Sequence, residues 1–93
     1  MLSGDDPDWG RLEQLARPAR DSGRLNPADL EAVILAVCEG HFLQVNVLAQ
    51  LLKRNARGLQ QRYLRKLVRE GRLELQHKGK PNLPDQAYRT VVL

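Results

Sequence analysis

The apolar positions of residues 27–39 recur at steps of three and four, the spacing that gathers side chains on one face of an α-helix. They are Leu30, Val33, Ile34, Val37 and Cys38. Asn26 and Pro27 are suited to cap and begin a helix here, and Gly40 can end it. The pattern therefore predicts a helix over residues 27–39 whose apolar face belongs to the core.

Two more helices are predicted after a short strand. The tetrapeptide HFLQ, residues 41–44, is too short for a helix and rich in apolar residues, so we expect a strand there. Residues 47–52 again repeat apolar side chains at helical spacing. Asn55 can cap a third helix over residues 56–70, which Gly71 would stop. The turn between these two helices is thus only a few residues long.

Alternation of apolar and polar residues replaces the helical spacing after the third helix. Leu73 and Leu75 alternate with polar residues in RLELQH, and AYRTVVL supplies a second β-forming run. The intervening KGKPNLPDQ, with one glycine and two prolines, predicts a long hairpin loop. Helix, short strand, helix, helix and hairpin are, in this order, the parts of a winged helix-turn-helix, whose hairpin is the wing. We predict this α+β, mainly helical fold over residues 26–93.

An extra amphipathic helix is predicted ahead of this domain, over residues 8–17. Its apolar positions are Trp9, Leu12, Leu15 and Ala16. Pro18 is expected to end it, because proline lacks the N–H that a helix interior needs. We expect the apolar face, Trp9 included, to lie on the domain. Residues 1–25 are thus interpreted as an N-terminal extension, with residues 18–25 as a connector.

Charge is unevenly distributed along the chain. The net charge is +4, but residues 1–39 hold eight acids and four arginines, whereas residues 40–93 hold eleven Lys and Arg against three acids. Between Lys53 and Lys80 there are ten cations and only two acids. Such a field raises the local concentration of polyanions. Nucleic acid is therefore the leading candidate partner.

The third predicted helix separates leucine from arginine. At about 100° per residue, one half of its circumference holds Leu59, Tyr63, Leu64, Leu67 and Val68. In a helix-turn-helix the second helix enters the major groove, where its first residues approach base edges and flanking cations meet phosphates. A merely solvated face is the alternative, although acids would normally pair with its cations. The predicted contacts of helix, turn and wing are Lys53, Arg54, Arg57, Gln61, Arg62, Arg65, Lys66, Arg69, Lys78 and Lys80.

Further positions in the helix and the hairpin are weaker candidates for DNA contact. Gly58 in the first turn would let a sugar-phosphate backbone approach, although a simply tolerated glycine is the alternative. The segment PNLPDQAYR is expected chiefly to fix the shape of the wing, with Tyr88 packed on the core. Arg89 is expected to face outward as a secondary phosphate contact.

Other chemistry is not indicated by the sequence. His41 and His77 are far apart and accompany a single cysteine, which falls short of a zinc site. Cys38 lies in an apolar run and is interpreted as a core thiol rather than a nucleophile. We expect no cofactor, no metal and no catalytic role. No apolar run is long enough to span a membrane, so a cytoplasmic protein is expected.

Two segments carry a resemblance to a known family. They are LEAVILAVCEGHFLQVNVLAQLLKRNARGLQQRYLRKLVREGRLEL and KPNLPDQAYRT, whose most specific parts are RYL..LV..G.L and KPN.PDQAYR. In these segments the chain resembles the C-terminal winged-helix domain of bacterial RecG-related ATP-dependent DNA helicases, which also carry a Schlafen-type or Alba-like ATP-binding domain. The resemblance implies a DNA-binding accessory module of a longer protein. Leu83 departs from the pattern, which has a histidine there. Helicase activity does not carry over, because the chain has no GxxxxGK[ST] loop.

The sequence thus favours a module that binds duplex DNA, with a monomer preferred and no membrane partner. Two alternatives remain open. Winged helices also dock onto proteins or onto other domains of a parent chain, for which exposed apolar residues at Trp9, Leu12 or Val92 would be the sign. The third possibility is a dimeric transcription regulator in which the N-terminal helix forms the dimer contact.

Overall fold

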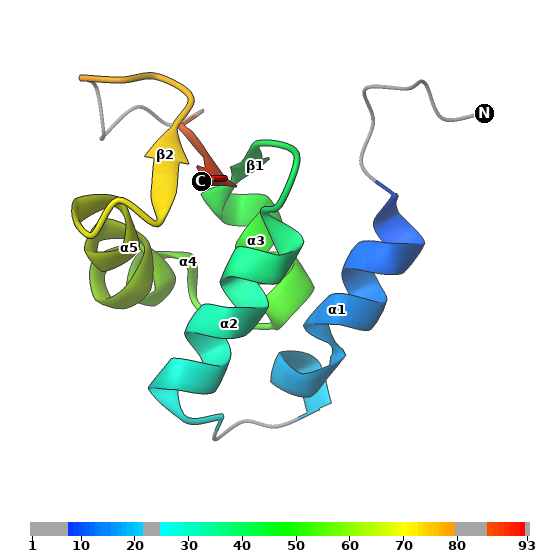
Figure 1. Cartoon of the computed structure of the whole chain (residues 1–93). Helices are drawn as coiled ribbons and strands as arrows, with labels where there is room; N and C mark the ends of the chain where they lie inside the picture. The colour runs from blue at the N-terminus through cyan, green and yellow to red at the C-terminus, as the bar shows by residue number, and fades with distance from the viewer. Residues whose placement is uncertain (1–7, 22–24, 80–85, 93) are drawn as a thin grey trace.

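The chain folds into an α+β structure that is mostly helical, with one small antiparallel sheet (Figure 1). This computed structural model describes residues 8–21, 25–79 and 86–92. The helices are α1 (Trp9–Asp21), α2 (Pro27–Val37), α3 (Val45–Leu52), α4 (Ala56–Leu59), the π-helical segment η1 (Gln60–Leu64) and α5 (Arg65–Arg69). The strands are β1 (Leu43–Gln44), β2 (Leu73–Leu75) and β3 (Ala87–Thr90). The predicted elements after residue 26 are therefore present in the predicted order.

Local capping chemistry sets the helix starts. The Asn26 side-chain oxygen accepts a hydrogen bond from the Asp29 backbone N–H at 3.1 Å, and Pro27 occupies the first turn. The Asn55 oxygen accepts one from the Gly58 N–H at 3.0 Å. Each bond satisfies a backbone donor that the first turn of a helix leaves without a partner. Both predicted caps are confirmed.

One continuous helix is formed by α4, η1 and α5, and we call it the composite helix. The backbone stays helical at both junctions, with φ/ψ of −62°/−48° at Gln60 and −62°/−41° at Arg65. The π-helical turn takes one more residue than an α-helical turn. Leu59 and Leu64, five positions apart, are consequently both buried, whereas Tyr63 is only half-buried. At a regular 100° per residue, Tyr63 and Leu64 would lie equally far from the centre of the buried face.

The N-terminal helix differs from its prediction. It runs through Pro18 to Asp21, so the predicted end at residue 17 and the connector starting at residue 18 are wrong. Pro18 is exposed, and the helical turn that follows it is held from the other side. There, Ala19 is fully buried, and its carbonyl oxygen accepts a hydrogen bond from Arg54 Nη1 at 2.9 Å. These contacts offset the hydrogen bond that proline cannot donate.

A single apolar core joins all the helices and the sheet. Leu12, Ala16 and Ala19 of α1 belong to the same buried cluster as the leucines of α2, α3 and the composite helix. In Figure 1, α2 and α3 lie between α1 on one side and the composite helix with β2 on the other. Leu12 is buried as expected, but the Trp9 side chain remains 40% exposed. The N-terminal helix therefore packs on the domain chiefly through Leu12, Ala16 and Ala19, with Trp9 at the edge of the contact beside Val47 and Leu51 of α3.

The sheet has the order β1-β3-β2, with both pairs antiparallel. Tyr88 of β3 stands opposite Leu43 of β1 and Leu75 of β2, and its side chain is buried as predicted. Gln86 lies just before β3, on the loop side of the β2–β3 pairing, and is 1% exposed. Its amide accepts from the His77 N–H at 2.9 Å and donates to the His77 carbonyl at 2.8 Å. These two hydrogen bonds hold Gln86 and His77 together where the pairing of β2 with β3 ends.

Candidate nucleic-acid interface

The outward side of the composite helix carries most of the predicted contact residues. Its inner side is anchored by Leu59, Leu64 and Leu67, all buried. This anchoring leaves the intervening positions in solvent. The exposed residues of the predicted set on this helix are Arg57, Gln61, Arg62, Arg65, Lys66 and Arg69.

Four of these cations have no carboxylate partner within the described residues. Arg57, Arg62, Arg65 and Arg69 make no ion pair there, and the nearest acid in sequence, Glu70, makes none either. Guanidinium groups stay protonated at any physiological pH and bind phosphate or carboxylate through paired donors. Below, the name arginine row denotes Arg57, Arg62, Arg65 and Arg69. It is a positive surface that no carboxylate in ranges 8–21, 25–79 and 86–92 pairs with.

Lys66, although adjacent to Arg65, has a different environment. Its Nζ lies 2.8 Å from Glu31 Oε1 of α2, and Arg72 Nη1 lies 3.9 Å from the other carboxylate oxygen. The hydrogen bond and the negative charge of Glu31 raise the pKa of Lys66 above its ordinary value of 10.5. Glu31 itself is only 8% exposed. The structure thus gives Lys66 a role in joining α5 to α2.

Arg54, predicted as a contact in the turn, is also engaged with the protein. Besides the Ala19 carbonyl, its Nη1 donates to the Leu52 carbonyl at 3.1 Å. It therefore ties the end of α1 to the end of α3. Lys53, by contrast, is exposed, and it adopts the left-handed conformation with φ of 52° that ends α3. Of these two turn cations, only Lys53 projects fully into solvent.

The hairpin contributes Lys78, which is exposed at the end of the described part of this segment. Lys80 and the predicted wing tip, including Leu83, lie outside the described residues. Arg89, the secondary candidate, does not face freely outward. Its Nε donates to Glu74 Oε1 at 2.7 Å, and its guanidinium stacks over the Phe42 ring, 4.4 Å from the centroid. Its side chain is nevertheless 42% exposed, and its role as a secondary phosphate contact stays a prediction.

Gly58 has open space where a side chain would begin. A Cβ built there would meet nothing closer than Asn55, at 3.9 Å. The protein's own packing does not require glycine at this position. Close approach of a ligand backbone and a simply tolerated glycine both remain compatible with this geometry.

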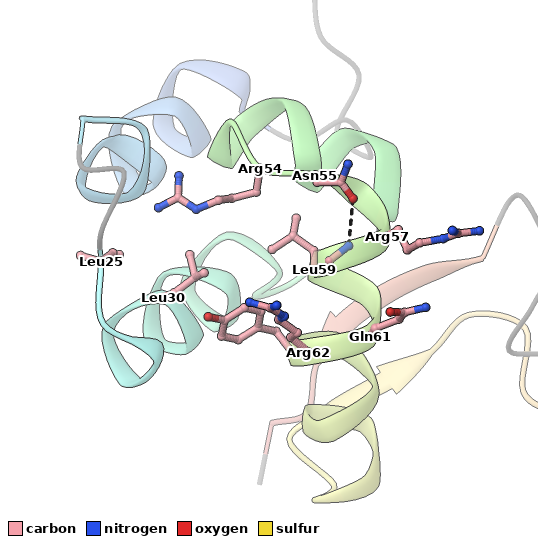
Figure 2. A pocket seen from close by; sticks show the side chains of 10 residues that line it. Leu25, Leu30, Arg54, Asn55, Arg57, Leu59, Gln61 and Arg62 are labelled. Atoms are coloured by element: carbon pink, nitrogen blue, oxygen red, sulfur yellow. Dashed lines mark hydrogen bonds between the residues drawn. The ribbon is translucent and has the colours of Figure 1, made fainter.

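A groove runs beside the composite helix (Figure 2). It encloses about 550 Å³ and lies between the N-terminal part of α2, the α3–α4 turn and the first half of the composite helix. Arg57 and Gln61 extend from the side of the helix that faces away from Leu25 and Leu30 (Figure 2). The groove is lined by Leu25, Leu30, Arg54, Asn55, Arg57, Gly58, Leu59, Gln61, Arg62 and Tyr63.

Sequence reasoning missed two features of this region. Glu31 stands three positions before Ile34 and seven before Cys38, so it shares the buried side of α2, and that spacing could have identified it. Leu25 lies outside any periodic segment. Its place in the groove depends on the tertiary fold, and no local signal predicts it.

The single cysteine of the chain lies in the core. Burial raises the pKa of the Cys38 thiol from 9.0 to about 12, which keeps it protonated. Within the described ranges, no three His, Cys, Asp or Glu side chains are grouped so that they could hold a metal ion. None of the helices in those ranges is long and apolar enough to cross a bilayer.

Comparison with protein-family models, curated proteins and solved structures finds no match to this chain.

Proposed function

We propose that the chain is a winged helix-turn-helix module that binds duplex DNA, with the composite helix in the major groove. The observation that carries this proposal is the arginine row. Its four cations have no carboxylate partner in the described residues, although the neighbouring cations Lys66, Arg72 and Arg89 all have one. A polyanion is the partner that such a row suits best.

The order and pairing of the elements support the winged arrangement. α3 and the composite helix, joined by the turn at residues 53–55, correspond to the two helices of the motif. β2 and β3 correspond to the wing, and β1 adds the third strand beside β3. The major groove of B-DNA, about 12 Å wide, admits one α-helix.

The proposed contacts divide along the composite helix. Arg57 and Gln61, in its first two turns, would approach base edges, because arginine pairs with guanine and glutamine with adenine in the major groove. Arg65 and Arg69 lie further along and would bind phosphates. Lys53 in the turn and Lys78 in the hairpin would add phosphate contacts on either side.

A fluorescence anisotropy titration with a labelled mixed-sequence duplex over a series of salt concentrations tests this proposal. Four phosphate contacts predict that the logarithm of the binding constant falls with the logarithm of salt concentration at a slope of roughly −4. Absence of binding at low salt, or binding that does not respond to salt, would contradict the proposal that the chain binds DNA.

The parent context is part of the proposal. The resemblance to RecG-related helicases supports an accessory role in a longer protein, in which this segment binds DNA and another domain supplies any ATPase activity. We assign no catalytic step to the present chain. Comparing the duplex affinity of this segment with that of a longer protein containing it would measure how much of the affinity it provides.

A protein-docking function is the second candidate. Of the three apolar residues that would mark it, Leu12 is buried, whereas Trp9 and Val92 are 40% and 79% exposed. Trp9 is the stronger candidate, because tryptophan often dominates binding energy at interfaces.

If α1 is instead the contact of a dimeric regulator, sedimentation would show a dimer that Trp9→Ala weakens.

A further inference from the structure

The groove beside the composite helix has a composition that DNA binding does not explain. Leu30 and Leu59, both nearly fully buried, form its floor. Leu25 and Tyr63, both half-buried, form its walls. Apolar surface is therefore present at the bottom of a cleft that Arg54 and Arg62 flank (Figure 2).

The charge lining this groove has one sign. Arg54, Arg57 and Arg62 line it together with the amides of Asn55 and Gln61, and no acid is among the described residues that line it. Two other clefts of the molecule are mixed in charge. One, beside α1 and α2, has both cations and acids, with Asp8 and Glu39 as the acids. The other, near Lys53, includes Glu13 and Asp21. The groove on the composite helix is the one of these three that favours an anion without opposing it.

An anion that fills this groove must also contribute apolar atoms. The sugar-phosphate backbone of a duplex can meet the arginines at the rim but has no branched apolar group to place against Leu25, Leu30 and Tyr63. A peptide can present carboxylates and an apolar side chain together, and pockets that take small ligands commonly have about 300–1,000 Å³. The groove, at about 550 Å³, falls in that range.

We propose that this groove binds a short acidic peptide segment that inserts one apolar side chain as an anchor. The anchor contacts Leu25 and Tyr63 above the Leu30–Leu59 floor. Its flanking carboxylate binds Arg62, since guanidinium and carboxylate form paired, charge-assisted hydrogen bonds. The segment belongs to a partner protein. This site goes beyond the proposed DNA function and does not depend on it.

The direct test uses two fluorescent peptides of equal charge. The first alternates aspartate and glutamate with leucine, and the second replaces each leucine with serine. The groove predicts that the leucine peptide binds about tenfold more tightly, because burial of one large apolar side chain is worth about that factor or more. Equal affinities would mean that only the positive surface is sensed, and this would overturn the proposal. Failure of the leucine peptide to bind would overturn it as well.

Matched variants separate this site from the DNA surface. Leu25→Ser removes an apolar wall without changing charge, so affinity for the leucine peptide is expected to fall about tenfold while duplex affinity stays unchanged. Arg69→Ala, on an exposed residue outside the groove, should do the reverse. Unchanged peptide affinity in a folded Leu25→Ser variant would contradict the proposed site.

A measurement on the unaltered protein covers the case in which Leu25→Ser does not fold. In an NMR titration with the leucine peptide, the largest amide shifts are expected at Leu25, Leu30 and Tyr63. Shifts confined to α1 or to the hairpin would refute the groove as the site. Because the duplex titration is separate, failure of either proposal leaves the other open to its own test.

Discussion

Two neighbouring sets of cations on this protein have opposite environments. Lys66 and Arg72 surround the nearly buried Glu31, and Arg89 is bonded to Glu74. The arginine row has no such partner in the described residues. The first set joins secondary-structure elements to one another, whereas the second leaves its charge available. Even adjacent residues such as Arg65 and Lys66 belong to different sets, so charge counted along a sequence overstates the surface that can bind a polyanion.

The largest effect is expected from a substitution on the buried side of the composite helix, because this side holds the arginine row in place. Leu64 is fully buried, and Leu64→Ala should lower the free energy of unfolding by about 3 kcal/mol, through lost apolar contacts and the cavity left behind. Urea denaturation measures this. The adjacent exposed variant Arg65→Ala is the control and should change stability by less than about 0.5 kcal/mol. Equal losses in both variants would mean that Arg65 is held by contacts the fold does not show.

Removing two members of the arginine row should act on binding rather than on stability. The double variant Arg62→Ala with Arg65→Ala is expected to weaken duplex binding by roughly thirtyfold, about 2 kcal/mol, and to reduce the salt slope by about 1, because Arg65 is the phosphate contact of the two. Anisotropy titrations at several salt concentrations measure both quantities. Arg11→Ala, which removes an exposed arginine from the first turn of α1, is the matched control. If the control weakens binding as much as the double variant, net charge rather than the arginine row governs affinity.

Alkaline pH should lower the stability of the fold, through Cys38 and Lys66, before it changes the charge of the arginines. The folded-state pKa values of Cys38 and Lys66 lie above their ordinary values of 9.0 and 10.5. A raised pKa contributes stability that is fully present below the unfolded-state value and is lost as pH rises through the folded-state value. The free energy of unfolding should therefore decline above about pH 9, by about 1 kcal/mol between about pH 8 and about pH 10 for the thiol.

Urea denaturation over this pH range measures the decline, and Cys38→Ala should make it shallower. The arginines keep their charge throughout this range. Duplex binding by the folded protein should thus persist where stability has already begun to fall. A stability that stays flat up to about pH 11 would contradict the raised pKa values.

The smallest expected effect comes from a substitution that leaves Lys66 and Arg72 without their carboxylate partner. Glu31→Gln removes the carboxylate that holds Lys66 and Arg72. Its negative charge no longer opposes a bound phosphate, and one charge at roughly 10 Å in water is worth roughly 0.4 kcal/mol. Duplex affinity is therefore expected to rise roughly twofold. Weaker binding in a folded variant would mean that the ion pair positions the composite helix for DNA.

Features set by neighbouring residues were predictable from the sequence. Asn26 and Asn55 cap the helices that follow them, and Gly71, with φ of 77°, follows the end of the composite helix, because each acts within about one turn. The strand positions and the burial of Tyr88 were predictable for the same kind of reason, since alternation and β-forming residues are local signals.

Features set by distant contacts were not predictable in this way. Pro18 is accommodated inside α1 because Arg54, thirty-five residues beyond Ala19, donates to that residue's carbonyl. The pairing of Lys66 with Glu31 also spans thirty-five residues, and no pattern along the composite helix indicates it. The candidate site was thus predictable as a basic helix face, but the division of its cations into engaged and available residues required the fold.

An NMR titration of the isotopically labelled chain with a short mixed-sequence duplex at two salt concentrations tests the central claim most directly. The account predicts amide shifts on residues 53–69 and near Lys78 that diminish at the higher salt concentration. Absence of shifts at low salt, or shifts confined to α1, would contradict DNA binding by the arginine row.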